Sequence, residues 1–114
     1  MRDDRQRLLD ILEAIDKIEG RLPAGRAQFL QDELIQVWVV HHIQRIGEAA
    51  AALSEPLRER HPRIPWRDIV AMRNVLVHQY FGVDLDEVWD TAVADLPSLR
   101  RDIEATLREE PPAT

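Results

Sequence analysis

The chain has 114 residues, of which 45% are hydrophobic and 32% charged, and its formal net charge is −6. This is the composition of one globular domain, and the acidic balance argues against a protein that binds nucleic acid through a broad basic surface. The chain contains no cysteine, which excludes disulfides, thiolate zinc sites and cysteine nucleophiles.

The amino-terminal stretch MRDDRQRLLDILEAIDKIEG is charged along its length, unlike a signal peptide. No apolar run approaches the roughly 20 residues that cross a bilayer. We therefore expect a cytoplasmic protein without a membrane segment. Residues 1–114 should form a single domain with frayed ends, at about 1–7 and 109–114.

The first predicted helix has one apolar stripe, whose residues recur at alternating spacings of three and four. These residues are Leu8, Ile11, Ile15, Ile18 and Leu22. Gly20 and Pro23 indicate where the helix ends.

A second segment, from about residue 26 to residue 53, contains no proline and predicts one long helix. It carries two apolar rows, one formed by Leu30, Leu34, Val37 and His41, the other by Ile35, Val39, Ile43, Ile46 and Ala50. Two rows indicate burial on two sides, which favours a homodimer contact. A central helix covered only by its own chain is the alternative, at roughly even odds.

The stretch SEPLRERHPRIP predicts a loop, and its last residue, Pro65, suits the first turn of a third helix that ends near Gly82. Asp84, with Glu87 three residues later, is typical of the start of a fourth helix. Pro97 should kink or break that helix. No segment has the pattern of a strand, so the fold class is all-α, a bundle of four to five helices.

The third predicted helix contains an unexpected arginine. At about 100° per residue, Arg73 lies at the centre of an apolar arc that includes Trp66, Ile69 and Tyr80. Asn74 and His78 lie one turn apart along the edge of this arc. A buried guanidinium without a partner is costly, so Arg73 must meet a carboxylate, carbonyl groups, a wet cleft or a bound anion.

These side chains suit metal-independent RNA cleavage, in which the ribose 2′-hydroxyl attacks its own phosphate. Arginine offers a charged, forked donor to phosphate oxygens, and histidine transfers protons near neutral pH. Asparagine could orient the imidazole or donate to the phosphate. The purely structural alternative pairs Arg73 with a buried carboxylate and His78 with a carbonyl, and periodicity by itself favours this alternative slightly.

The stretch RNVLVHQY, Arg73 to Tyr80, resembles the R-x4-H-x-Y signature of the HepT-like toxins of the HEPN superfamily. The flanking stretches RIGEAAAALSEPLRERHP, IPWRDIVAMRN and YFGVDLDEVWDTAVADLPSLRRDI are similar to that family in order and spacing. The resemblance covers roughly residues 8–103. It implies an antiparallel HEPN-type helical bundle that forms a homodimer, with a composite cleft where the two motif helices meet.

The resemblance further implies the toxin of a type VII-like toxin–antitoxin pair, an endoribonuclease with Arg73, Asn74 and His78 as catalytic residues and no cofactor. The implied partner is an MNT-type nucleotidyltransferase antitoxin, which would transfer AMP from ATP to Tyr80. Added phosphates beside Arg73 would block RNA by charge and by volume. The alternative is a non-catalytic helical subunit that docks a nucleotidyltransferase, with that partner as the active component. A weaker alternative is a structural homodimer in which Arg73 forms only an interface ion pair.

Other polar and aromatic residues suggest no further site. His41 and His42 are about 100° apart on a helix and cannot chelate one metal as an i, i+4 pair would. With His61 in a predicted loop, we expect no metal site. The three tryptophans are better suited to the core or an interface than to base stacking, and Glu48 could pair with Arg73 but is more simply a solvated residue.

Overall fold

The structure of the chain, a computed structural model, describes residues 3–78 and 84–110, except for the side chains of residues 74–78. Throughout these ranges the regular elements are helices, which confirms the predicted all-α fold class. The four longest are α1 (Asp4–Glu19), α3 (Glu33–Ala51), α5 (Trp66–His78) and α7 (Leu96–Glu109). Shorter elements are α2 (Arg26–Leu30), α4 (Glu55–Arg60), α6 (Leu85–Asp90) and a π-helical turn, η1 (Thr91–Asp95). No helix within the described ranges is long and apolar enough to cross a membrane.

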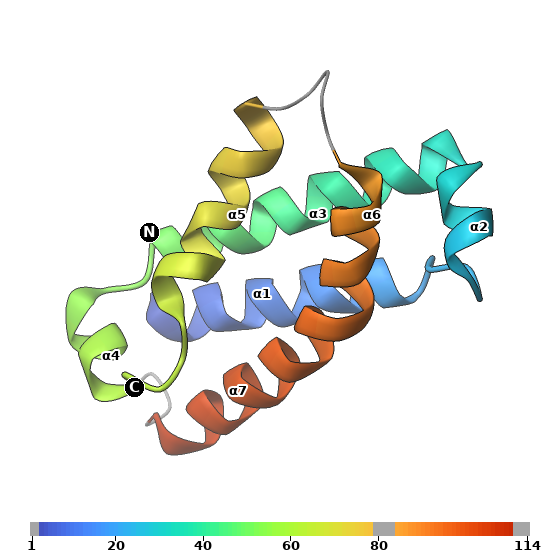
Figure 1. Cartoon of the computed structure of the whole chain (residues 1–114). Coiled ribbons are helices and arrows are strands. Elements are labelled where there is room, and N and C mark those ends of the chain that lie inside the picture. Colours follow the sequence, from blue (N-terminus) through green and yellow to red (C-terminus); the bar gives the residue numbers. More distant parts are fainter. Residues whose placement is uncertain (1–2, 79–83, 111–114) are drawn as a thin grey trace.

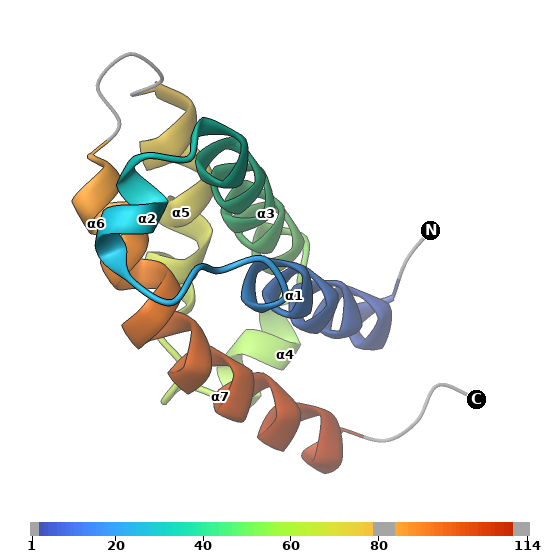
Figure 2. The same cartoon turned by 90° about the vertical axis from the view of Figure 1, so that its right-hand side faces the viewer.

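The long helices pack in a chain of pairwise contacts. α1 lies against both α3 and α7, and α5 crosses the other side of α3 (Figures 1 and 2). α3 is therefore the central element, and it supports the helix that carries the candidate site.

The predicted apolar stripe of α1 forms part of the core, since Leu8, Ile11, Ile15 and Ile18 are all fully buried. The helix ends at Glu19 with Gly20 as its cap, as the sequence indicated. Its start differs from the frayed end that we expected. Asp3 and Gln6 form a reciprocal capping box, so residues 4–7 are helical.

The prediction of one helix over residues 26–53 is wrong, because the chain turns between α2 and α3. Asp32 begins α3 as its N-cap, and its carboxylate accepts a hydrogen bond from the Ile35 amide at 3.2 Å. An aspartate that caps a new helix competes with the continuation of the old one. The short helix α2 lies beside α6 (Figure 2). Phe29 of α2 packs on Trp89 of α6, with ring centroids 5.4 Å apart.

The two apolar rows of α3 have different environments. The row of Val39, Ile43, Ile46 and Ala50 is buried in the core. The other row lies outside, with Leu34 82% and Val37 57% exposed. The chain itself therefore covers one row and leaves the other open to solvent.

Residues 55–60, which we expected in a loop, form the helix α4. The hydroxyl of Ser54 caps it by accepting a hydrogen bond from the Leu57 amide at 3.3 Å, and also donates to the Asp4 carboxylate at 2.6 Å. A serine followed by Glu55 and Pro56 is a good helix start, and the prolines of this stretch led us to overlook it.

The last helical segment is interrupted where Pro97 predicted a kink or break. Asp84 caps α6 by accepting from the amides of Asp86 and Glu87, as expected. Because Pro97 has no N–H, the carbonyl four residues before it lacks its usual donor. The chain forms the wider turn η1 here, in which the Leu96 amide donates to the Thr91 carbonyl, before α7 begins.

Candidate active site on helix α5

The amino-terminal end of α5 is firmly anchored. The indole N–H of Trp66 donates to the His61 carbonyl at 3.0 Å, and the Trp66 side chain is buried. Ile69, nearly one turn later, is also buried, and Val70 and Met72 pack at the edge of the core. This confirms the predicted apolar face of the helix as far as residue 72.

α5 lies very close to α3 at Arg73. Gly47 of α3 is buried directly against it, and a Cβ atom built on Gly47 would lie 2.6 Å from the Arg73 amide nitrogen. The backbone of Arg73 therefore belongs to the contact between the two helices. The sequence wheel placed Arg73 at the centre of the buried arc, and the structure agrees.

The guanidinium of Arg73 is not neutralised by the described part of the chain. Arg73 as a whole is half-buried. No hydrogen bond or ion pair joins its guanidinium to residues 3–72 or 84–110. Glu48, which could have paired with Arg73, points to solvent as an exposed residue. The purely structural alternative required a carboxylate partner, and the described residues do not provide one.

The other predicted site residues are placed only in part. Asn74 and His78 lie on α5, one and five residues after Arg73, and their side chains are outside the described part. Tyr80 and Gly82 lie outside the described residues altogether. The structure thus establishes the backbone that carries Arg73, Asn74 and His78, and the environment of Arg73.

The two histidines of α3 lie side by side in different environments. The rings of His41 and His42 are 4.9 Å apart, with His41 exposed and His42 buried against Trp38. Burial and the neighbouring positive charges lower the pKa of His42, which favours its neutral form. Among the described residues, no group of three or more histidine or acidic side chains could hold a metal ion.

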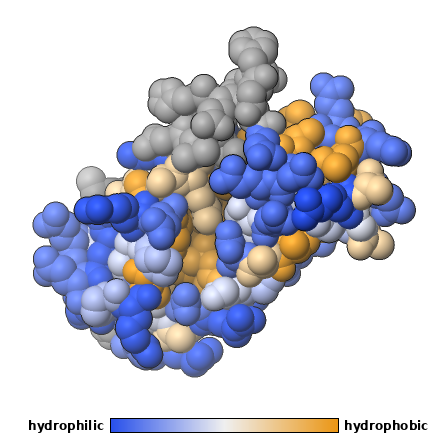
Figure 3. All heavy atoms as spheres, in the orientation of Figure 1, coloured by the Kyte–Doolittle hydropathy of each residue, from blue (hydrophilic) through white to orange (hydrophobic). Residues whose placement is uncertain are grey.

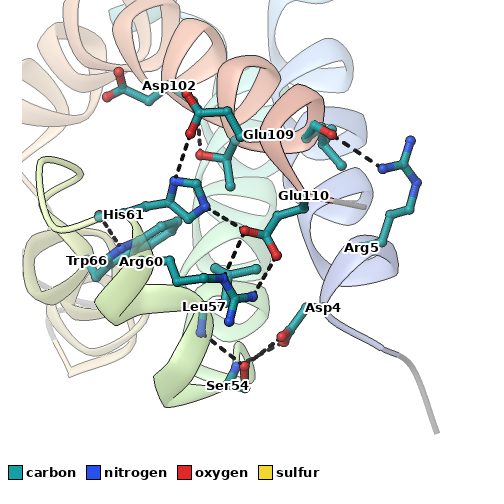
Figure 4. A network of polar contacts seen from close by, with 12 residues as sticks. Asp4, Arg5, Ser54, Leu57, Arg60, His61, Trp66, Asp102, Glu109 and Glu110 are labelled. Carbon is teal, nitrogen blue, oxygen red and sulfur yellow. Dashed lines mark hydrogen bonds and ion pairs between the residues drawn. The ribbon is translucent and has the colours of Figure 1, made fainter. Parts of the chain in front are cut away.

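A polar cluster that does not include Arg73 joins the end of α4 to the end of α7 (Figure 4). His61 lies between two carboxylates, with Glu110 at 2.7 Å and Glu109 at 3.3 Å, and Arg60 donates to Glu110 at 2.6 Å. Arg60 compensates the charge of Glu110, so the cluster explains how the end of α7 is held and does not suggest catalysis.

Comparison with known proteins relates this arrangement to a family. The family model described as "Ribonuclease HepT-like" matches residues 11–106, which include α5 and the α3 helix beneath it. The chain belongs to the HepT-like ribonuclease family. This membership confirms the resemblance that the stretch from Arg73 to Tyr80 suggested.

Individual relatives agree with this assignment. The chain is 39% identical over 100 residues to "Probable ribonuclease HepT" of Thermococcus cleftensis, covering 87% of this chain and 91% of the relative. It is 35% identical over 104 residues to "Putative RNase MJ1380" of Methanocaldococcus jannaschii, covering 90% and 95%. It is 34% identical over 96 residues to "Putative RNase TTE0752" of Caldanaerobacter subterraneus, covering 84% and 83%. No solved structure gave a significant match.

One residue beside Arg73 in this candidate site was missed from the sequence. Gly47 stands in the middle of a helix, where glycine is less favourable than alanine. Such a glycine calls for a reason in packing. The stretch RIGEAAA therefore contained a signal, although only the fold shows that the partner of Gly47 is Arg73.

Proposed function

We propose that this HepT-like chain is an endoribonuclease that cleaves RNA without a metal ion. The observation that carries the proposal is Arg73, a half-buried arginine at the centre of a helix–helix contact, whose guanidinium has no partner in the described chain. A cation that is held on the helix and has no partner in the described chain is available to bind an anion, and a phosphate of RNA is such an anion. The names of the relatives support RNA as the substrate.

The proposed reaction uses Arg73 and His78 in different roles. His78 accepts the proton of the ribose 2′-hydroxyl, whose oxygen forms a bond to the adjacent phosphorus. The bond from phosphorus to the 5′-oxygen breaks, which leaves a 2′,3′-cyclic phosphate, and the departing oxygen takes up a proton from water. Arg73 binds a non-bridging phosphate oxygen and stabilises its developing charge, while Asn74 orients the imidazole or donates to the phosphate.

A cleavage assay with a fluorescent RNA in the presence of EDTA tests this reaction. Arg73→Ala and His78→Ala should each lower the rate by at least about 100-fold, in the range of lost general acid–base or electrostatic catalysis. Arg67→Ala is the matched control, because Arg67 is an exposed arginine on the same helix. If both site variants cleave RNA as fast as the wild type, the assignment is wrong.

We also propose that the active form is a homodimer that uses the outer row of α3. Leu34 and Val37 of α3 are 82% and 57% exposed, Leu30 at the end of α2 is 39% exposed, and hydrophobic surface is visible at this end of the molecule (Figure 3). Contiguous exposed apolar residues favour an interaction surface. A second copy with the same row is the simplest partner, and a composite RNA cleft would form where two copies of α5 meet.

In the cell, the proposed partner is an MNT-type nucleotidyltransferase that acts as the antitoxin. It would transfer AMP from ATP to the Tyr80 hydroxyl, with release of pyrophosphate. The added charge and bulk would keep RNA from Arg73. Intact-mass measurement after incubation with the partner and ATP should show AMP-sized additions, and Tyr80→Phe should remove them.

The same assays separate this proposal from a non-catalytic docking subunit. Such a subunit would form a stable complex with the nucleotidyltransferase, yet the purified chain would not cleave RNA. The net charge of −6 is the observation that favours it, since an acidic surface suits a basic protein partner better than RNA. Growth arrest by the chain expressed without its partner, lost in His78→Ala, would rule it out.

A further inference from the structure

Gly47 occupies an unusual position in α3. It is buried within a well-formed helix, between Ile43 and Ala50, which are also buried. A Cβ atom at this position would lie 2.6 Å from the amide nitrogen of Arg73, 2.9 Å from its Cβ and 3.2 Å from its Cα. The two helices can approach this closely only because residue 47 has no side chain.

The contact involves the backbone and Cβ of Arg73 and not the flexible end of its side chain. The tip of a long side chain could rotate away from an added methyl group, whereas backbone atoms and Cβ move only with the helix. α3 and α5 would have to separate by roughly 1 Å to restore ordinary carbon contacts of about 3.5–4.0 Å. Any side chain at residue 47 therefore displaces Arg73 itself.

We propose that Gly47 is a positioning residue for Arg73, an inference that rests on the proposed ribonuclease function. Contact with Gly47 fixes the first atoms of the Arg73 side chain against α3. This restricts the directions in which the rest of the side chain can extend, and so restricts the position of the guanidinium. The guanidinium, which has no partner among the described residues, is then directed before the substrate arrives.

The chemistry makes this positioning important. An arginine side chain has much rotational freedom, and holding it in place before binding reduces the entropy lost on reaching the transition state. The guanidinium must also meet a phosphate oxygen whose charge increases during the reaction. A displacement of about 1 Å in such a site can lower the rate about 100-fold.

The decisive variant is Gly47→Ala, measured by RNA cleavage at a temperature well below its unfolding transition. We expect kcat to fall about 10- to 100-fold while KM stays within about twofold, since the loss concerns alignment in the transition state. Gly25→Ala is the matched glycine control, because nothing lies within 4 Å of a Cβ at residue 25 and its φ of −145° suits any residue. This control should keep the wild-type kcat.

A second control separates positioning from stability. Ile103→Val, in α7, removes a methyl group from a fully buried side chain, and α7 packs mainly on α1 and not on the contact of Gly47 with Arg73. It should lower the melting temperature and leave kcat unchanged. If Gly47→Ala keeps the wild-type kcat, or if Ile103→Val loses as much kcat as Gly47→Ala, the positioning role is wrong.

Nuclear magnetic resonance of the wild-type protein provides a test that does not depend on activity or on the folding of a variant. The Nε–Hε group of Arg73 should be ordered, whereas that of the exposed Arg67 on the same helix should be mobile. An order parameter of Arg73 below about 0.6 would overturn the proposal, because such a side chain moves freely. If Arg73 is ordered but the protein cleaves no RNA, the positioning role is retained and the ribonuclease function is rejected.

Discussion

His61 and Glu110 are in direct contact: Nε2 of the imidazole lies 2.7 Å from Oε2 of the carboxylate, although 49 residues separate them in the chain (Figure 4). Arg60 donates two further hydrogen bonds to the same carboxylate, at 2.6 and 3.1 Å. The contact fastens the end of α7 to the segment from which α5 starts. It explains why Glu110 is held where we expected a frayed end.

The hydrogen bonds from Arg60, and next those from His61, lower the pKa of Glu110 to about 2. A carboxyl group whose folded pKa is depressed stabilises the fold above its unfolded pKa of 4.5, and this stabilisation is lost as the pH falls toward 2. Glu110→Gln should therefore lower the free energy of unfolding at pH 7 by about 1 kcal/mol, because solvent screens the half-exposed Arg60. Urea unfolding at pH 7 and pH 3 measures the difference, which should shrink at pH 3. Glu109→Gln, which alters an exposed neighbour, is the control and should have little effect.

Acid should also weaken the fold through His42. Burial, followed by the charges of His41, Lys17 and Arg45, lowers its pKa below 6.5. The folded chain thus prefers the neutral ring, and the stability of this arrangement is complete above pH 6.5 and decreases as the pH falls below that value. His42→Phe should make the melting temperature less sensitive to pH between 7.5 and 5. The role of His42 would be contradicted if His42→Phe kept the wild-type pH dependence of the melting temperature. It would also be contradicted if His41→Gln, at an exposed residue, abolished that dependence.

Phe29 should anchor α2 to the rest of the molecule. Its side chain is fully buried and packs on Trp89 of α6, and Arg26 of α2 forms ion pairs with Asp86 and Asp90 of the same helix. Phe29→Ala should lower the free energy of unfolding by about 3–5 kcal/mol, as for other large-to-small core changes. Arg26→Ala should cost less than about 1 kcal/mol, because its ion pairs are exposed. Chemical denaturation of the two variants compares the contributions of Phe29 and Arg26 to the free energy of unfolding. Equal losses of stability would contradict the role of Phe29 as the main anchor of α2.

The outer row of α3 should determine the oligomeric state. Leu34→Glu places a charge in the proposed interface and should convert the dimer to a folded monomer, as measured by size-exclusion chromatography with light scattering. Leu9→Glu is the matched control, because Leu9 is 46% exposed on α1 and lies outside the row. The opposite result, with dissociation by Leu9→Glu alone, would move the interface to α1. Circular dichroism of both variants confirms that the helices remain.

Local pattern predicted much of this fold. The stripe of α1, the buried row of α3 and the cap at Asp84 all follow from spacing or from the chemistry of one side chain, so the sequence contains them in full. The turn at Asp32 and the helix α4 were missed for a related reason. A capping side chain and a proline each allow more than one local structure, and the choice depends on what the segment packs against.

The candidate site divides in the same way. The sequence by itself determined that Arg73 lies in the buried arc of its helix, one residue before Asn74 and five before His78, because helical periodicity fixes these relations. Only the tertiary structure decided that the arc meets α3 at Gly47 and that the guanidinium finds no partner in the described chain. A helix repeats every 3.6 residues and so constrains its own neighbours. Which distant residue it touches depends on how the whole chain packs, and no local pattern records that contact.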